Sequence, residues 1–278
     1  IRQALNRPYC QLWTYYDAVV THRLYQQDSI FPVRGAWNNK IICYTQAGSQ
    51  KPFMVCASAE LVDLHFVGAA AGTECIPLWR YDESGNRVDN ITDWALKQFK
   101  DHYKITVAPA EAGAQRLSAS SQAKALDPGF RRDDEFKQGK PRAITKQAIF
   151  HYVYAVLHDP LYREKYAQNL KREFPRIPFY ADFWRWSEWG RQLMDLHIGY
   201  ESVAPWPLQR IEKNGTPGAS EPSPQPLSRG ERGFSPKAML KADKDAGTIV
   251  LDSETTLAGI PPEAWTYKLG NRCALEWM

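Results

Sequence analysis

The chain has 278 residues, of which 44% are hydrophobic, enough for one large domain or two small ones. A net charge of +4 and a pI near 8.7 permit nucleic-acid binding without requiring it. No apolar run approaches the roughly 18 residues of a transmembrane helix and no signal peptide is visible, so we expect a cytoplasmic protein with no membrane partner. The five cysteines are widely spread and form no CxxC pair, which is typical of free thiols in a reducing compartment.

Short strands and one helix are predicted for residues 1–107. Residues 1–35 mix aromatic and basic side chains, which suggests irregular and strand-like pieces. Apolar runs between glycine-containing turns predict four short strands, at residues 40–45, 53–57, 61–67 and 75–81. Asn90 is predicted to cap a helix that continues through Tyr103, with Asp93 well placed in its first turn.

Three consecutive helices separated by prolines are predicted for residues 144–201. Thr145 is suited to cap the first helix, and Asp159-Pro160 ends it and starts the second. The second helix is predicted to carry a face of side chains that recur every four residues, namely Tyr162, Tyr166, Leu170 and Phe174. Asp182 is suited to cap the third helix, whose predicted inner face is Phe183, Trp186, Gly190, Leu193 and His197. Because glycine is costly inside a helix, we expect another element to approach Gly190 closely.

Two stretches of low complexity divide the chain. Residues 108–134 and 214–236 have little periodic apolar content and are rich in Pro, Gly, Ser and Ala, so we interpret them as insertions. The predicted organisation is α+β, with an N-terminal α/β part of short antiparallel strands at 1–107, an insertion and linker at 108–143, a helical core at 144–213, an insertion at 214–236 and a small C-terminal β/α piece at 237–278.

Both ends of the chain suggest truncation. Ile1 opens the sequence without an initiator Met. Near the other end, residues 248–250 are predicted to form a strand, and a helix capped by Asn271 stops at Met278 after fewer than two turns, which is marginal for a helix. We therefore expect a fragment of a longer polypeptide or of a disrupted gene.

Known catalytic signatures are missing from this sequence. It contains no GxxxxGK[ST] phosphate-binding loop, no HExxH metal motif and no tetrapeptide of Asn or Asp, Pro, Pro and an aromatic residue. We therefore predict no catalytic residue and no metal ligand in this chain.

The central helices also carry a resemblance. The run YVYAVLHDPLYREKYAQNLKREFPRIPF, followed by DFWRWSEWGRQLMDLHIGYE, resembles the C-terminal part of Type ISP restriction-modification enzymes. Further stretches fit the same region in the same order, at residues 1–17, 39–68, 74–99 and 257–278. Enzymes of that family are large single polypeptides with a nuclease, a helicase-like ATPase, an adenine-N6 methyltransferase and then a target-recognition domain.

The resemblance implies a function that the motifs alone do not. It implies sequence-specific recognition of duplex DNA, without catalysis, by the specificity region of an adenine-specific DNA methyltransferase with restriction activity. S-adenosylmethionine, ATP and Mg²⁺ are implied for the parent enzyme, and no cofactor is implied for this chain. The implied partners are duplex DNA and the methyltransferase and helicase domains of the parent.

Two segments are predicted to contact DNA through a loop and a helix end. In the glycine-containing loop, Ser49 allows close approach of the backbone, Gln50 is suited to read adenine and Lys51 to neutralise phosphate. A basic cluster at a predicted helix end comprises Lys171, Arg172 and Arg176. The alternatives are an ordinary hairpin with a solvated lysine, and a basic cluster that only stabilises the helix dipole.

Two further pairs complete the candidate DNA-binding residues. Arg185 and Arg191 lie among tryptophans and are suited to stack or to pair with phosphate, although core packing of those tryptophans is the alternative. Asn271 and Arg272 follow a glycine, and the alternative to a DNA contact is a cap for the final helix.

Two other functional hypotheses stay open. In one, the aromatic-rich helices form an interaction module that packs on the methyltransferase or helicase domain of the parent. In the other, the chain is a remnant of a disrupted gene whose insertions prevent folding.

Overall fold

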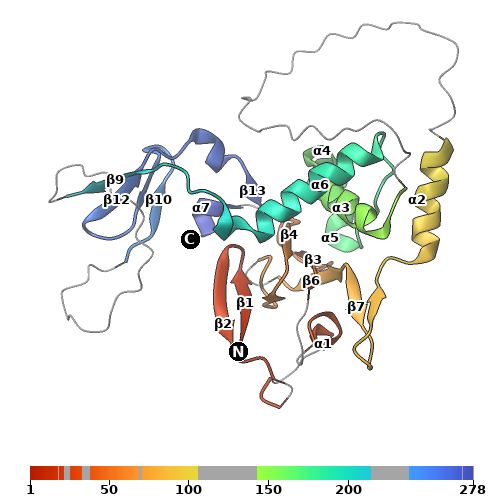
Figure 1. Cartoon of the computed structure of the whole chain (residues 1–278). Coiled ribbons are helices and arrows are strands. Elements are labelled where there is room, and N and C mark those ends of the chain that lie inside the picture. The colour runs from red at the N-terminus through yellow and green to blue at the C-terminus, as the bar shows by residue number, and fades with distance from the viewer. Residues whose placement is uncertain are drawn as a thin grey trace, which may run out of the picture.

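The computed structural model describes residues 1–17, 19–21, 26–32, 38–68, 71–105, 143–213, 238–270 and 272–277. The predicted α+β class is confirmed: small sheets form the N-terminal part, helices lie in the centre and another sheet lies at the C-terminal end (Figure 1). The sequence stretches interpreted as insertions, 108–134 and 214–236, lie outside the described residues. In the described part of the chain, no helix is both long and apolar enough to cross a membrane.

Most of the strands in the N-terminal part pair in an antiparallel manner. One sheet has the order β2-β1-β5, in which β1 and β5 are parallel, and a second has the order β4-β3-β6. The strands of these sheets and of the β7–β8 hairpin are β1 (Arg2–Arg7), β2 (Cys10–Thr14), β3 (Ile41–Thr45), β4 (Val55–Ser58), β5 (Leu61–Val62), β6 (Thr73–Pro77), β7 (Trp79–Tyr81) and β8 (Arg87–Asp89). A short helix, α1 (Gln27–Ile30), precedes β3.

The predicted strands at 61–67 and 75–81 are shorter in the structure. The first ends at Val62, because the Asp63 carboxylate accepts the N–H of His65 at 2.8 Å and the chain turns. The second is divided at Leu78, which is buried and donates its N–H to the carbonyl of Lys40 at 2.9 Å. As a result β6 pairs with β3, whereas β7 pairs with β8.

Helix α2 (Asp93–Ile105) is capped by a residue other than the predicted one. The Thr92 hydroxyl accepts the N–H of Ala95 at 3.2 Å, as an N-cap does. The predicted cap, Asn90, instead donates from its side-chain amide to the carbonyl of Pro77 at 3.0 Å. Asn90 therefore fixes the chain between the sheet and the helix.

The central helices start where the capping residues predict. The side chains of Thr145, Asp159 and Asp182 accept backbone N–H groups at the starts of α3 (Lys146–His158), α4 (Pro160–Lys165) and α6 (Phe183–Ile198). The second predicted helix is bent at Tyr166 into α4 and α5 (Ala167–Arg172), and it ends before Phe174. This bend accompanies burial of both Tyr162 and Leu170.

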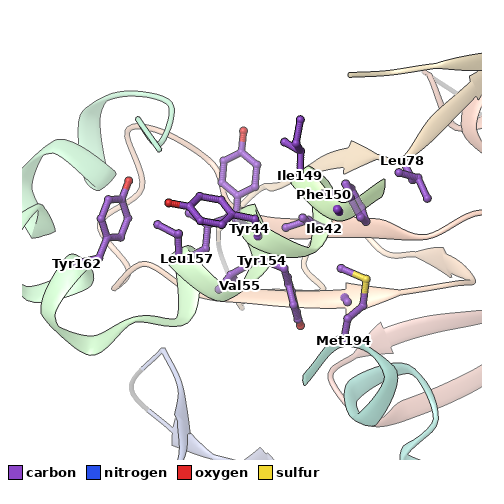
Figure 2. Close-up of a cluster of buried hydrophobic side chains, with 14 of the residues drawn as sticks. Ile42, Tyr44, Val55, Leu78, Ile149, Phe150, Tyr154, Leu157, Tyr162 and Met194 are labelled. Atoms are coloured by element: carbon purple, nitrogen blue, oxygen red, sulfur yellow. The ribbon is translucent and has the colours of Figure 1, made fainter. Parts of the chain in front are cut away.

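Helix α3 is the centre of the largest core. It is buried on nearly all sides, which is typical of a helix enclosed by other elements rather than one with a solvent-facing stripe. Ile42, Tyr44 and Val55 from β3 and β4 and Met194 from α6 belong to the same cluster as its side chains, as Figure 2 shows. The sheet β4-β3-β6, α3 and α6 therefore share one hydrophobic core.

At Gly190 the helix α6 approaches α3 closely. A Cβ atom at Gly190 would lie 1.8 Å from the carbonyl oxygen of His151, so only glycine fits here, and the predicted close approach is confirmed. Beside this contact the buried Ser187 hydroxyl donates to the carbonyl of Ala148 at 2.9 Å. The predicted inner face was partly wrong, because Ser187 and Met194 are buried where Trp186 and Leu193 were expected, and those two are only half-buried.

The C-terminal part contains more strand than the sequence predicts. The predicted strand at 248–250 is β11 (Thr248–Val250). Three strands that were not predicted join it, namely β9 (Gln209–Glu212), β10 (Lys241–Asp243) and β12 (Thr255–Ala258). The order in this sheet is β10-β11-β12-β9. A hairpin and a helical turn follow, with elements β13 (Lys268–Leu269), β14 (Arg272–Cys273) and α7 (Ala274–Trp277). Residues 209–212, grouped with the helices by sequence, thus pair with β12. The predicted cap Asn271 lies outside the described residues.

A histidine joins the C-terminal part to the helices. The two ring nitrogens of His197 bond to the hydroxyls of Tyr154 on α3 and, at 2.9 Å, of Tyr267 beside β13. Burial, and next the charge of Arg163, lower the pKa of His197 to about 4. His197 is therefore neutral at pH 7 and provides one donor and one acceptor.

We expect Gly190→Ala to lower the free energy of unfolding by roughly 2–3 kcal/mol, because the new methyl group meets the α3 backbone. Helix propensity alone would give a change of opposite sign. Urea unfolding followed by tryptophan fluorescence measures the difference. Gly68→Ala is the matched control, since a Cβ at Gly68 would meet only Ala71 Cβ at an ordinary 3.5 Å. Equal stability of Gly190→Ala and wild type would contradict the close contact.

The lowered pKa of His197 makes stability depend on pH. In the folded chain the imidazole resists protonation, whereas in the unfolded chain it titrates near its ordinary value of about 6.5. The stabilisation is therefore complete above pH 6.5 and is lost as the pH falls towards 4, by about 3 kcal/mol in all. The variant His197→Gln, which cannot titrate, should show a smaller decrease in unfolding free energy between pH 7 and pH 4.5. Identical pH profiles of the two proteins would refute this role.

Candidate nucleic-acid interface

Two of the predicted DNA-contacting segments meet in the structure. Residues 46–52 lie in the loop that connects β3 to β4, and Gly48 donates an N–H to the carbonyl of Lys171 at 2.6 Å. Lys171 lies in the last turn of α5, where carbonyl groups lack partners within the helix. Gly48 has a φ of +85°, which other residues rarely adopt. We name residues 46–52 and 169–176 together the loop–helix junction.

Hydroxyl groups of the loop and a bond to Gly72 hold the loop in addition to the helix. Thr45 closes the hairpin, since its hydroxyl accepts the N–H of Met54 at 3.0 Å. Gln46 donates its N–H to the carbonyl of Gly72 at 2.9 Å, and a Cβ at Gly72 would lie 2.1 Å from the Gln46 side-chain oxygen. The Ser49 hydroxyl accepts the N–H of Lys51 at 3.0 Å. The loop conformation is thus fixed on both sides.

Aromatic rings fasten the helix end to the sheet. The ring of Tyr44 on β3 lies 6.3 Å from that of Phe174, which follows α5, and 6.2 Å from that of Phe53. The Tyr44 hydroxyl donates to the Glu74 carboxylate at 2.7 Å, and burial, followed by this bond, raises the pKa of Tyr44 above its ordinary value. Tyr44 therefore remains a neutral donor. It connects β3 both to β6, through Glu74, and to the end of α5, through Phe174.

The exposed side chains of the loop–helix junction are mainly basic or amide-bearing. Gln50, Lys51, Lys171 and Arg172 are exposed, and Ser49 is half-buried. The Arg176 side chain is 89% exposed and pairs with Glu173 at 2.7 Å. Because such exposed pairs contribute little, Arg176 is able to exchange this carboxylate for a phosphate. The junction therefore offers several cations beside an amide that can read a base edge.

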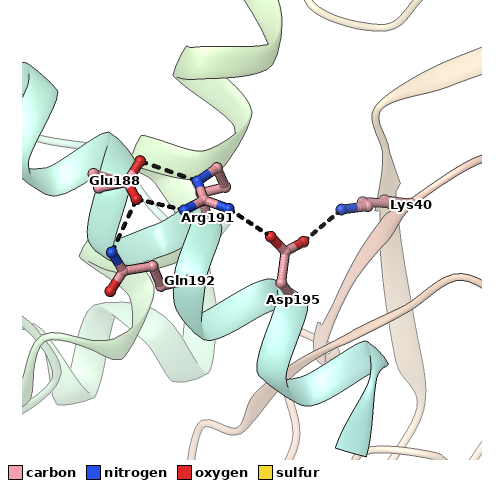
Figure 3. A network of polar contacts seen from close by, with 5 residues as sticks. All are labelled: Lys40, Glu188, Arg191, Gln192 and Asp195. Carbon is pink, nitrogen blue, oxygen red and sulfur yellow. Dashed lines mark hydrogen bonds and ion pairs between the residues drawn. The ribbon is translucent and has the colours of Figure 1, made fainter. Parts of the chain in front are cut away.

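The predicted residues on α6 have protein partners instead. Arg191 forms ion pairs with Glu188 at 2.6 Å and with Asp195 at 2.9 Å, and Asp195 also pairs with Lys40 at 2.8 Å (Figure 3). The hydrogen bond from Arg191 to Glu188 is the main cause of its raised pKa. The guanidinium of Arg185 lies 4.6 Å from the ring centre of Trp189. The network around Asp195 connects α6 to the residue that precedes β3.

The last predicted pair lies in the C-terminal part. Arg272 is exposed and opens β14, where it pairs in register with Leu269. Asn271 lies outside the described residues. These two residues and those on α6 stay candidates for DNA contacts.

A groove beside the loop–helix junction was not predicted from the sequence. It has a volume of about 310 Å³ and is lined by Tyr162, Tyr166, Asn169, Leu170, Glu173, Phe174, Pro175, Arg176, Ile177 and Pro178. The sequence pattern placed Phe174 on one face with Tyr162 and Leu170, but those two are buried whereas Phe174 is 68% exposed. The end of α5 before Phe174 agrees with the Phe174-Pro175 pair in the sequence, because a residue before proline avoids helical conformation.

The described part of the chain contains no candidate metal site, and two of its buried cysteines are unreactive. There, no group of three or more His, Cys, Asp or Glu residues is placed to hold a metal ion. The five cysteines are free thiols. Burial raises the pKa of Cys56 to about 12 and that of Cys43 well above its ordinary value, so neither forms a reactive thiolate near pH 7.

Solved structures of DNA complexes have the same fold. A cryo-EM structure of a DrdV–DNA complex is 42% identical with a TM-score of 0.75, and the match covers 100% of this chain and 23% of that chain. The nuclease-deletion mutant of the Type ISP restriction-modification enzyme LlaGI, in complex with a DNA substrate mimic, is 22% identical with a TM-score of 0.63 and is matched over 99% of this chain and 20% of its own. The ATP-dependent Type ISP enzyme LlaBIII bound to DNA is 19% identical, with a TM-score of 0.68 and coverages of 99% and 15%.

The family is settled by the whole sequence. No curated protein matches the chain, which spans 15% to 23% of the length of the solved proteins above. The family described as Type ISP C-terminal specificity domain, however, matches residues 1–278. The chain therefore belongs to the family of C-terminal specificity domains of Type ISP restriction-modification enzymes.

Proposed function

We propose that this chain recognises a specific sequence in duplex DNA as the specificity region of a longer restriction-modification polypeptide. The observation that carries the proposal is the loop–helix junction, in which a bond of 2.6 Å between Gly48 and Lys171 joins two segments that each have the chemistry of a DNA contact. The 42% identity to a protein described in complex with DNA supports the same reading.

Within the junction the side chains divide into two roles. Lys51, Lys171, Arg172 and Arg176 neutralise phosphates and set the register of the protein on the duplex. Gln50 reads a base edge, since a side-chain amide pairs with adenine N6 and N7 in the major groove. Gly48 and Ser49 carry no bulky side chain, so the loop backbone is able to approach the duplex.

The chemistry of the whole enzyme belongs to other parts of the polypeptide. In our proposal the bound duplex is presented to an adenine-N6 methyltransferase domain, which extrudes the target base and uses S-adenosylmethionine. ATP and Mg²⁺ serve the helicase-like and nuclease domains. The residues of this chain bind and orient DNA and transfer no group themselves.

A second candidate function is favoured by the N-terminal hairpin. Its strand β2 pairs only with β1 among the described strands, and Leu12, Trp13 and Tyr15 on or next to it are 50%, 72% and 64% exposed. Exposed apolar surface of this kind marks interaction sites. The alternative function is therefore an interaction module that packs on the methyltransferase or helicase domain. A third possibility is a remnant of a disrupted gene, which a cooperative melting transition would exclude.

Selection of bound sequences from a random duplex pool, at two salt concentrations, tests the proposed function. We expect wild-type protein to enrich one motif, and Gln50→Ala to lose discrimination at one position of that motif by roughly 5- to 150-fold. Gln98→Ala, an exposed glutamine on α2, is the control and should select the wild-type motif. If protein that melts cooperatively enriches no motif and binds no duplex, the interaction module becomes the better account.

We expect the double variant Lys171→Ala/Arg172→Ala to bind all duplexes roughly 10- to 100-fold more weakly near physiological salt. Each lost phosphate contact should also reduce the slope of log affinity against log salt by about 0.9. Fluorescence anisotropy titrations at several salt concentrations measure both quantities. The double variant Arg80→Ala/Lys97→Ala removes the same charge from exposed positions on β7 and α2, so its affinity should stay close to that of wild type. Equal losses in both double variants would show that only net charge matters.

A further inference from the structure

We propose that the groove between α5 and residues 173–178 holds a single nucleobase that has left the base stack of the DNA. This inference rests on the proposed function and adds a second binding mode to it. The groove shares Asn169, Glu173, Phe174 and Arg176 with the loop–helix junction, so a nucleotide bound there lies beside the phosphate-binding cations.

The walls of the groove suit a flat aromatic ligand. Phe174, which is 68% exposed, lines the groove together with Tyr162 and Tyr166, whose rings lie 5.1 Å apart. The buried Leu170 adds an apolar surface to the lining. Base–aromatic stacking is the interaction that such side chains offer, and it works with any base because every base has a π face.

The groove stays open because its backbone is held in place. The Tyr162 hydroxyl donates to the carbonyl of Arg176 at 2.9 Å, which anchors the extended segment after α5. At the other side of that segment, the Tyr152 hydroxyl donates to the carbonyl of Pro178 at 2.7 Å and accepts the N–H of Tyr180 at 2.6 Å. A base therefore enters a preformed site, and the protein loses little conformational entropy when the base binds.

Polar groups at the groove indicate which bases it prefers. Asn169 on α5 and Glu173, the residue that ends this helix, both line the groove, and the Glu173 N–H bonds to the carbonyl of Asn169 at 2.8 Å. A carboxylate only accepts hydrogen bonds, and Glu173 uses one oxygen for Arg176, which leaves acceptor capacity for an exocyclic amine. Adenine, cytosine and guanine carry such an amine at their pairing edge and thymine does not, so the groove disfavours thymine.

Size and charge select a nucleotide over other flat or apolar ligands. A volume of about 310 Å³ lies at the lower end of the range for small-molecule sites, about 300–1,000 Å³, which suits one ring system. Lys171 and Arg172 on the same helix, together with Arg176, give the surroundings a positive charge that complements a phosphodiester. A proline-rich peptide would use the aromatic walls but not these cations.

The experiment uses the full 278-residue chain and three duplexes of one sequence. The first is fully paired, the second carries one extrahelical adenosine, and the third carries an abasic residue in place of that adenosine. We expect the extrahelical adenosine to bind about tenfold more tightly than the abasic residue. Phe174→Ala should abolish this difference, whereas Phe174→Trp should retain it. Because Phe174 also belongs to the loop–helix junction, the readout is the ratio of affinities for the extrahelical and abasic duplexes, not the affinity for the fully paired one. Leu161→Ala, 74% exposed on α4 and not part of the groove, is the matched control.

A fluorescent base provides a second readout. With 2-aminopurine as the extrahelical base, we expect binding of the wild-type chain to quench its emission through stacking, and Phe174→Ala to leave the emission high. Equal affinity for all three duplexes, or equal loss of affinity for all three in Phe174→Ala, would overturn the groove as a base site while the proposed function stands. Failure to bind any of the duplexes would overturn both proposals.

Discussion

The structure depends on the contact between α3 and α6 at Gly190. Helix α3 has almost no solvent-facing side, so it needs a second helix whose surface can reach its backbone. Gly190 and the hydrogen bond from Ser187 to Ala148 provide that surface. The other side of α3 then remains for the sheet β4-β3-β6, and one continuous core forms between helix and sheet.

The positions of the surface elements follow from this core. Because Asp159-Pro160 joins α3 directly to α4, the direction of α3 decides where α5 ends, and that end meets the loop between β3 and β4. At the far end of α6, His197 connects the same core to the C-terminal part through Tyr267. Polar contacts at the ends of α5 and α6 thus add to the apolar packing that holds the described parts of the chain together.

The basic residues differ in what they are able to do because their neighbours differ. Arg191 is enclosed by two carboxylates and takes part in a network that holds α6 against the N-terminal part. Lys171, Arg172 and Lys51 are exposed at the loop–helix junction, where Glu173 pairs with the nearby Arg176. A guanidinium held by two carboxylates, as that of Arg191 is, is less available to a phosphate than the exposed cations of the junction, which makes the junction, rather than α6, the better candidate surface.

The sequence by itself determined the family and the α+β class, because an ordered set of short stretches encodes them. It also determined the capping residues Thr145, Asp159 and Asp182 and the close approach at Gly190, because local chemistry encodes each of these. The short C-terminal strands β9, β10 and β12 escaped prediction, since three or four residues carry little periodic signal and β9 lies far in sequence from its partner β12. The pairing of Gly48 with Lys171, the exposure of Phe174 and the groove beside it were decided only by the tertiary structure. All three arise where segments distant in sequence are brought together by a shared core, and no local pattern records which segments those are.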